Sequence, residues 1–196
     1  MDQIDFLKKY IKNDKRLIHS YSVAEHMKEH AAYFGIDAEE AYTAGIFHDI
    51  AKEFSDETLI ELSENFIARN IFKINYFPFK KKMPFLLHGT AGAEILLKEY
   101  GLENKNILEA IIHHTTGGEK ISLLAKYTFI FDYCEPLRED PDSVKIYHLL
   151  VKQKCFDEAY FMTYKSMLKY FISKKILICL ESINGYNEAL ELLANK

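Results

Sequence analysis

The sequence predicts an all-α protein, a helical bundle of about eight to ten helices. Apolar residues recur three and four positions apart, as on one face of a helix, for example at Ile107, Leu108, Ile111 and Ile112. Only 4 prolines and 8 glycines interrupt 196 residues, so long helices are expected. Alternating patterns bounded by turns, which would indicate strands, are almost absent.

Residues typical of helix starts and helix ends divide the first half of the chain into expected helices. Four helices are expected here: one around residues 4–11, one from near Arg16 to Gly35, one over 38–51, and one that follows an N-cap at Ser55. Residues 69–87 then carry two prolines, four lysines and an arginine. This composition predicts a basic, aromatic surface loop.

The second half continues in the same way. Helices are expected from about His88 to Gly101, from about Asn104 to His114, from about Ser122 to a point before Pro136, and as two or three further helices over 142–196.

Composition limits the class of protein. The length suits one domain with a core of its own, and the net charge of −4 excludes a broadly basic nucleic-acid binder. Cys134, Cys155 and Cys179 lack the spacing of a zinc knuckle or a disulfide framework. The charged N-terminus lacks the features of a signal peptide, and no apolar run approaches the roughly 18 residues of a membrane span. A soluble, cytoplasmic protein is therefore expected.

The strongest local signal for chemistry is AGIFHDIAK at 44–52, where His48 and Asp49 are neighbours in an apolar helix. A buried carboxylate is costly without a cation, so burial here would imply a metal ion or an ion pair. The alternative is an exposed His-Asp pair. Lys52, one turn after Asp49, is either an ordinary solvated lysine or, beside a metal, a phosphate contact.

Asp132 is a second buried-acid signal, because it stands among Phe129, Ile130, Phe131 and Tyr133. It calls for a cation in the same way. The alternative is a charge at a helix end that bonds a nearby arginine or tyrosine.

Six further histidines lie in suggestive places. His19, His26 and His30 form roughly one helical stripe, but three rings along about 16 Å cannot all meet one ion, and spacing does not choose among them. His88 and the pair His113 and His114 lie at expected helix ends, where side chains reach a cleft easily. Each of these could equally be a capping or partly exposed histidine.

These signals occur in one order that resembles a known family. The ordered motifs are R-x-x-H at 16–19, AGIFHDIAK at 44–52, LLHG at 86–89, HHTTG at 113–117 and DYCEPLR at 132–138. His19, His48-Asp49 and Asp132 resemble the H…HD…D signature of the HD-domain metal-dependent phosphohydrolases. The whole set resembles the bacterial symmetrical bis(5′-nucleosyl)-tetraphosphatases, the YqeK-type HD proteins.

The resemblance implies a single HD domain over 1–196, with 142–196 as C-terminal helices that complete the bundle. It implies an iron centre, and it selects His19 from the stripe; the implied metal ligands are His19, His48, Asp49 and Asp132. A set of nitrogen and oxygen ligands also suits Mn, Co or Zn. The implied nucleotide contacts are His19, Lys52, His88, His114, Thr115, Asp132 and Arg138, and the implied catalytic residues are Asp49, Lys52, His88 and His114.

The implied activity is hydrolysis of diadenosine tetraphosphate to two ADP by a hydroxide held on the metal, with His88 or His114 as a proton donor if its pKa is near neutral. Two alternatives stay open: an HD phosphohydrolase acting on nucleoside mono- or triphosphates or guanosine polyphosphates, and a non-catalytic nucleotide-binding regulator. The run Lys80-Lys81-Lys82 has two interpretations: it could bind RNA, or it could be a solvated stretch of the surface. The expected partner is a small nucleotide, and no association with a membrane is expected. The sequence leaves the oligomeric state open, and a homodimer is possible.

Overall fold

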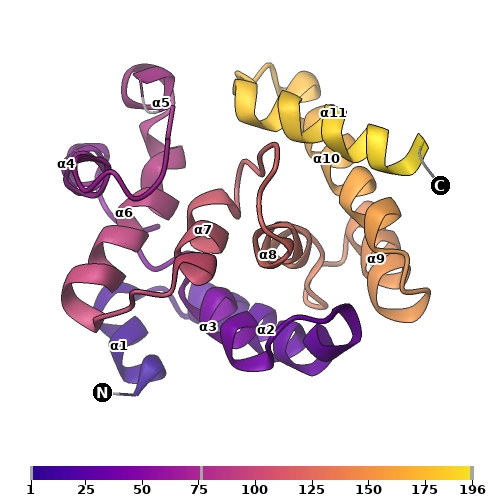
Figure 1. Cartoon of the computed structure of the whole chain (residues 1–196), viewed down its shortest axis with the longest axis horizontal. Helices are drawn as coiled ribbons and strands as arrows, with labels where there is room; N and C mark the ends of the chain where they lie inside the picture. Colours follow the sequence, from indigo (N-terminus) through magenta and orange to yellow (C-terminus); the bar gives the residue numbers. More distant parts are fainter. Residues whose placement is uncertain (1, 76, 195–196) are drawn as a thin grey trace.

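A computed structural model describes residues 2–75 and 77–194 of the chain. Within these residues the chain forms eleven α-helices and no strand, so the all-α prediction is confirmed (Figure 1). Short 3-10 and π-helical segments, labelled η, extend or connect several of the helices.

The first half of the chain contains the elements α1 (Gln3–Tyr10), α2 (Asp14–Ala31), η1 (Ala32–Phe34), α3 (Ala38–Phe47), α4 (Asp56–Ala68), α5 (Phe77–Lys82) and η2 (Pro84–Leu87). The second half contains α6 (His88–Ile95), η3 (Leu96–Tyr100), α7 (Lys105–His113), α8 (Leu123–Cys134), α9 (Pro141–Tyr147), η4 (His148–Lys152), α10 (Phe156–Lys174) and α11 (Leu180–Ala194).

Several predicted helix ends are confirmed by their hydrogen bonds. The side chains of Ser55, Asn104 and Ser122 each accept from backbone N–H groups in the first turn of the following helix, which satisfies donors that have no partner within a helix. The segments that begin with α2 and α6 end at Gly35 and Gly101, as expected.

Two expectations about local structure are wrong. The segment 69–87 is not simply a loop, because it contains the short helix α5 and the 3-10 segment η2. The helix expected over 38–51 ends at Phe47 instead. From there the backbone tightens into turns, with Ile50 N–H bonded to Phe47 O at 3.1 Å and Lys52 N–H to Asp49 O at 2.8 Å. These turns present His48 and Asp49 at a helix end rather than on a helix face.

Glycines allow two helix pairs to approach closely. A Cβ atom on Gly45 would lie 2.7 Å from the Cα atom of Ala24, so α3 can pass α2 at this distance only with glycine there. A Cβ atom on Gly89 would lie 2.5 Å from the carbonyl oxygen of Ile111, which ties α6 to α7 in the same way. These contacts set the spacing of the elements that carry the histidines.

Helix α8 occupies the middle of the molecule. It packs against α2, α3 and α7 on one side and against α9 and α10 on the other. In Figure 1 it is seen end-on, between the N-terminal helices and the α9–α11 group. Its central residues Phe131 and Ile130 are fully buried, so a charged residue in this helix sits at a junction between both halves of the fold.

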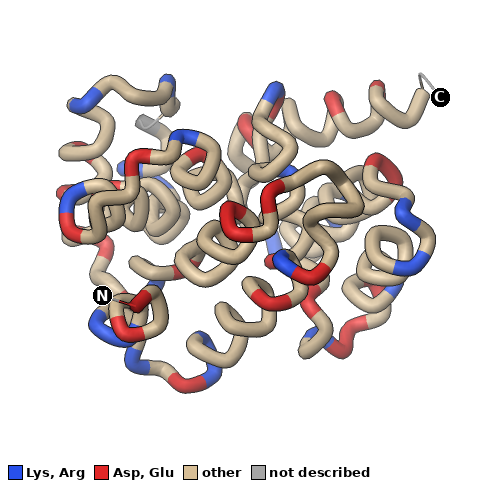
Figure 2. The backbone as a smooth tube through the Cα atoms, turned by 60° about the horizontal axis from the view of Figure 1, so that its bottom comes forward, with Lys and Arg blue, Asp and Glu red and all other residues tan. Residues whose placement is uncertain are grey.

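Charges of both signs alternate along the backbone in the view of Figure 2. The three-lysine run lies on α5, and Lys80 of that run pairs with Glu64 of α4. Among the helices of the described residues, none combines the length and apolar character needed to cross a membrane.

Candidate active site

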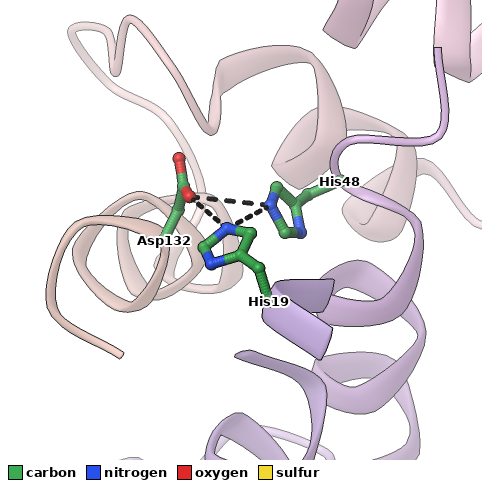
Figure 3. Close-up of side chains that lie close together, drawn as sticks. All are labelled: His19, His48 and Asp132. Carbon is green, nitrogen blue, oxygen red and sulfur yellow. Dashed lines mark hydrogen bonds and ion pairs between the residues drawn. The ribbon is translucent and has the colours of Figure 1, made fainter. Parts of the chain in front are cut away.

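Three side chains from three elements meet where α2, α3 and α8 adjoin (Figure 3). His19 lies in α2, His48 follows the last residue of α3, and Asp132 lies in the last turn of α8. The Nε2 atom of His19 is 3.0 Å from Asp132 Oδ1 and 3.2 Å from His48 Nε2. His48 Nε2 is 3.6 Å from the same carboxylate oxygen.

Helix ends fix the orientation of three imidazoles. Each ring directly follows the last residue of a helical segment, and its Nδ1 atom lies 2.7 Å from the carbonyl oxygen three residues earlier; the pairs are His48 with Gly45, His88 with Phe85, and His114 with Ile111. A carbonyl oxygen only accepts, so each Nδ1 atom carries a hydrogen. In the neutral rings each Nε2 atom therefore presents a lone pair, and these atoms converge on one place.

His19 is oriented by a carboxylate instead. Its Nδ1 atom lies 3.2 Å from Glu135 Oε1. Burial disfavours the charged ring, but hydrogen bonds to Asp132 and Glu135 outweigh burial and raise the pKa of His19 to about 9. The second oxygen of Glu135 accepts from Ser22 Oγ at 2.6 Å and from Leu137 N–H at 2.8 Å, so this carboxylate is itself held in place.

Asp49 connects the two ends of the cluster. Its Oδ2 atom lies 3.8 Å from His48 Nε2, and its Oδ1 atom lies 3.2 Å from His88 Nε2 and 3.3 Å from His114 Nε2. Burial opposes ionisation, but the surrounding imidazoles and Lys52 hold the pKa of Asp49 well below its usual range. No hydrogen bond of good geometry reaches the buried Oδ1 atom, although the Lys52 ammonium lies 3.3 Å away, so this oxygen can accept a further cation.

Lys52 and Thr115 complete the end of the cluster near Asp49. The Nζ atom of Lys52 is 3.3 Å from Asp49 Oδ1 and 3.0 Å from His88 Nε2. Thr115 Oγ1 lies 3.1 Å from His88 Nε2 and 2.8 Å from His114 Nε2. Burial and the charge of Lys52 lower the pKa of His88 to about 4. This lowered pKa favours the neutral ring of His88.

Arg138 stands at the opposite end, near Asp132. Its guanidinium donates to the backbone oxygen of Asp132 at 2.9 Å and lies 3.5 Å from Asp132 Oδ1. The arginine contact proposed as an alternative for Asp132 thus exists together with the two histidine contacts. Burial opposes ionisation of Asp132, but its interactions with His19 and His48 outweigh burial and hold its pKa well below the usual range.

A groove of about 450 Å³ opens over this cluster. Its lining includes His19, the carboxylates of Asp49, Asp132 and Glu135, and four cationic side chains, Lys15, Arg16, Lys52 and Arg138. Arg16 lies 3.9 Å from Asp49 Oδ2. The cluster is therefore reached through an opening suited to an anionic ligand.

The donor groups fit a metal ion. Two overlapping sets have ligand atoms within 4.8 Å of one another: His19, His48 and Asp132 form one, and His48, Asp49 and His114 form the other. Imidazole nitrogens and carboxylate oxygens without thiolate suit Fe, Mn, Co or Zn. The buried carboxylate of Asp49 and the converging Nε2 atoms are the features that a cation would satisfy.

The other histidines lie outside both sets. His26 donates from Nδ1 to Ser22 O at 2.8 Å and packs edge-on against Tyr147. His30 lies 3.8 Å from Glu29, and His148 is exposed. His113 Nδ1 bonds Gly117 O at 3.0 Å, so it stabilises the turn that carries His114.

Sequence reasoning missed two supports of the site. The first support is Glu135, which the sequence analysis includes only within the motif DYCEPLR. Its position next to Cys134, at the end of an apolar helix, is the signal that could have indicated a buried acid. The second support is Tyr164 of α10, whose hydroxyl accepts from Gly118 N–H at 2.9 Å. Tyr160 donates to Gly118 O at 3.2 Å, so both tyrosines hold the segment 113–118 from the far side of the fold.

Comparisons with known proteins agree with this arrangement. Residues 16–137 match the family model of the HD domain. A protein of Bacillus subtilis named symmetrical bis(5′-nucleosyl)-tetraphosphatase is 29% identical over 174 residues, which are 89% of each chain. A protein of the same name from Halalkalibacterium halodurans is 34% identical over 133 residues, 68% of this chain and 67% of that one.

A solved structure shows the same fold. It is the crystal structure of a protein from Clostridium acetobutylicum that is described as a predicted HD superfamily hydrolase involved in NAD metabolism. It superposes with a TM-score of 0.84 at 28% identity and covers 96% of this chain and 95% of its own.

Proposed function

The chain belongs to the HD-domain family, and we propose that this hydrolase cleaves diadenosine tetraphosphate symmetrically into two molecules of ADP. The relatives from Bacillus subtilis and Halalkalibacterium halodurans carry the name of that activity. The observation that carries the proposal is the position of the cluster: imidazoles and carboxylates that suit a metal lie at the floor of a groove lined by four cationic side chains.

We assign His19, His48, Asp49 and Asp132 as the residues that would hold the metal, and iron as the metal. A cation bound there supplies a Lewis acid that neutralises phosphate charge and makes water a stronger acid. Support comes from the Nε2 lone pair of His48 and from the buried carboxylate of Asp49 beside it. Glu135 keeps the ring of His19 in its orientation.

The remaining groups bind phosphate. Lys52 and Arg138 stand at opposite ends of the cluster and each can form charge-assisted hydrogen bonds with phosphate oxygens. The Thr115 hydroxyl is a further donor beside His88 and His114. These groups orient the polyphosphate and stabilise the charge that develops on it during transfer. Because ADP is a weakly basic leaving group, the neutral state of His88 does not prevent the reaction.

The position of these groups favours cleavage in the middle of the substrate. If they hold an ADP unit against the cluster, the β-phosphate of that unit is the one that reacts, and the other half leaves as ADP. A site that held only an AMP unit would place the α-phosphate there and give AMP and ATP. At the end near Asp49, Lys52 and the Thr115 hydroxyl are donors for such a diphosphate, which supports the first outcome.

The bond that breaks can be identified in ¹⁸O-water. We expect ADP as the sole nucleotide product of diadenosine tetraphosphate, with one ¹⁸O atom in one of each two ADP molecules, after anion-exchange separation and mass spectrometry. The metal content is measured on the same sample. ATP and AMP in equal amounts would overturn symmetrical cleavage. An intact dinucleotide, with release of phosphate or diphosphate from nucleoside triphosphates, would favour an HD phosphohydrolase with a different substrate.

A further inference from the structure

A second hollow, here called the outer pocket, lies where α8, α9 and α10 meet. It has a volume of about 650 Å³ and is lined by Tyr133, Arg138, Asp140, Asp142, Lys169 and Tyr170, among others. Small-molecule sites usually have volumes of about 300–1,000 Å³. None of the metal-ligand candidates lines this pocket, so it is a separate feature of the surface.

Arg138 joins the outer pocket to the groove over the cluster, since its side chain lines both. Its guanidinium is anchored to Asp132 O at 2.9 Å. A polyphosphate that contacts Arg138 from the groove therefore brings the next part of the same molecule to the entrance of the outer pocket. The two hollows are placed to receive two parts of one ligand.

The charges of the two hollows differ in a way that matches a dinucleotide. The groove has four cationic side chains against three carboxylates, and a metal held by Asp49 and Asp132 would add further positive charge, which suits phosphates. In the outer pocket, Arg138 and Lys169 are balanced by Asp140 and Asp142, which suits an uncharged group. The ring of Tyr170 is 52% exposed and free to stack on a base, and the carboxylate of Asp142 can accept hydrogen bonds from ribose hydroxyls.

We propose that the outer pocket binds the nucleoside of the half that is expelled when a dinucleoside polyphosphate is cleaved. This inference rests on the proposed function. The cluster has two ends: Lys52, His88 and His114 surround Asp49, whereas Arg138 stands beside Asp132. With the retained ADP unit held at the end near Asp49, the other half extends past Asp132 and Arg138 toward the outer pocket.

The test compares a substrate that has the second nucleoside with one that lacks it. The full-length, iron-loaded protein is assayed with diadenosine tetraphosphate and with adenosine 5′-tetraphosphate, and ADP release is followed. Loss of the stacking between a base and an aromatic ring typically weakens the affinity for the ligand roughly five- to hundredfold. We expect Tyr170→Ala to raise the KM for the dinucleotide by about tenfold and to leave the KM for adenosine 5′-tetraphosphate unchanged.

Two further variants separate stacking from damage to the fold. Tyr170→Phe keeps the ring and should retain the wild-type KM for both substrates. Ile172→Ala removes an exposed side chain, 68% accessible, from the same helix outside the outer pocket, and should change neither KM. Equal KM values for Tyr170→Ala and wild type on the dinucleotide, or an equal loss on both substrates, would overturn the assignment. A wild-type protein that leaves the dinucleotide intact would overturn the proposed function itself, and the assignment with it.

Discussion

Glu135 holds His19 in place across the seam between α8 and α2. The Oε1 atom of Glu135 lies 3.2 Å from His19 Nδ1, and the two residues are 116 positions apart in the chain. The other carboxylate oxygen is held by the Ser22 hydroxyl at 2.6 Å. Because the Nδ1 side of the ring faces this fixed carboxylate, the Nε2 atom is directed at Asp132 and His48.

Replacing Glu135 by Gln should therefore weaken metal binding while the fold is retained. Gln keeps the size of the side chain but loses the charge that orients His19, and such supporting residues usually change metal affinity by roughly 10–100-fold. The dissociation constant for the metal, measured by calorimetric titration, should rise by that factor. Glu139→Gln, at an exposed position nearby, should leave it unchanged. An unaltered dissociation constant in Glu135→Gln would show that Glu135 does not position the ring.

The contact between Glu135 and His19 also marks the limit of what the sequence could predict. Caps such as Ser55 and Asn104 were predictable, because their signals lie within a few residues of the structure they form. The choice of His19 over His26 could not be predicted in this way, since both occupy one helical stripe and their partners lie far away in the sequence. The resemblance to the HD-domain family selects His19, whereas the helical periodicity of the sequence does not distinguish the histidines of this stripe.

Two further features could not be predicted from neighbouring residues: the short helix within 69–87 and the end of α3 at Phe47. In 69–87 the prolines and lysines predicted a loop, yet Pro78 and the three lysines after Phe79 lie in α5. Proline is tolerated in the first turn of a helix, so this signal was ambiguous. The helix that ends at Phe47 continues in the apolar pattern to Ala51, and only the bond of the His48 ring to Gly45 O reveals why it stops.

Tyr164→Phe should destabilise the turn that carries His114 and Thr115. The phenol hydroxyl accepts the buried N–H of Gly118 at 2.9 Å, and a buried donor left without a partner costs about 1–3 kcal/mol. The free energy of unfolding in urea should fall by that amount, and kcat should fall with it while the metal is retained. Tyr33→Phe, at a ring that is 67% exposed, is the control and should change neither quantity. Wild-type stability and kcat in Tyr164→Phe would mean that the turn is held by other contacts.

Gly45→Ala should cost stability and metal affinity together. The added methyl group would lie 2.7 Å from the Cα atom of Ala24, a backbone atom that cannot move without shifting α2. Overpacking of this kind costs about 1–3 kcal/mol, and it also displaces His19 relative to His48. Both the urea midpoint and the metal affinity should fall.

Gly92→Ala is the matched comparison for that variant. Its new methyl group would meet the Cγ2 atom of Ile50 at 2.9 Å, which is the end of a side chain and can turn away. We expect a smaller loss of stability there and no change in metal affinity. Equal losses in the two variants would show that close approach of α2 and α3 is not what sets the site.

The last prediction concerns removal of the metal. Without a cation, the carboxylate of Asp49 is buried among imidazoles, and the Nε2 atoms of His88 and His114 lie 2.9 Å apart. A ligand that binds only the folded state at 1,000 times its dissociation constant stabilises that state by about 4.1 kcal/mol. For a chain of this length each kcal/mol shifts Tm by about 2–4 °C. Chelation should therefore lower Tm by roughly 8–16 °C, and added iron should restore it.

Two variants make this shift specific to the assigned ligands. Asp132→Ala removes a carboxylate that lies 3.0 Å from His19 Nε2, so its Tm should no longer respond to chelator or iron, and activity should be lost. The apolar core is formed by other residues, so the variant should still unfold cooperatively. His26→Ala, whose ring bonds Ser22 O at 2.8 Å away from the cluster, should keep the full metal-dependent shift. If Asp132→Ala retained the shift, or His26→Ala lost it, the ligand assignment would be wrong, because the metal would then be held by atoms other than those that converge at the end of α8.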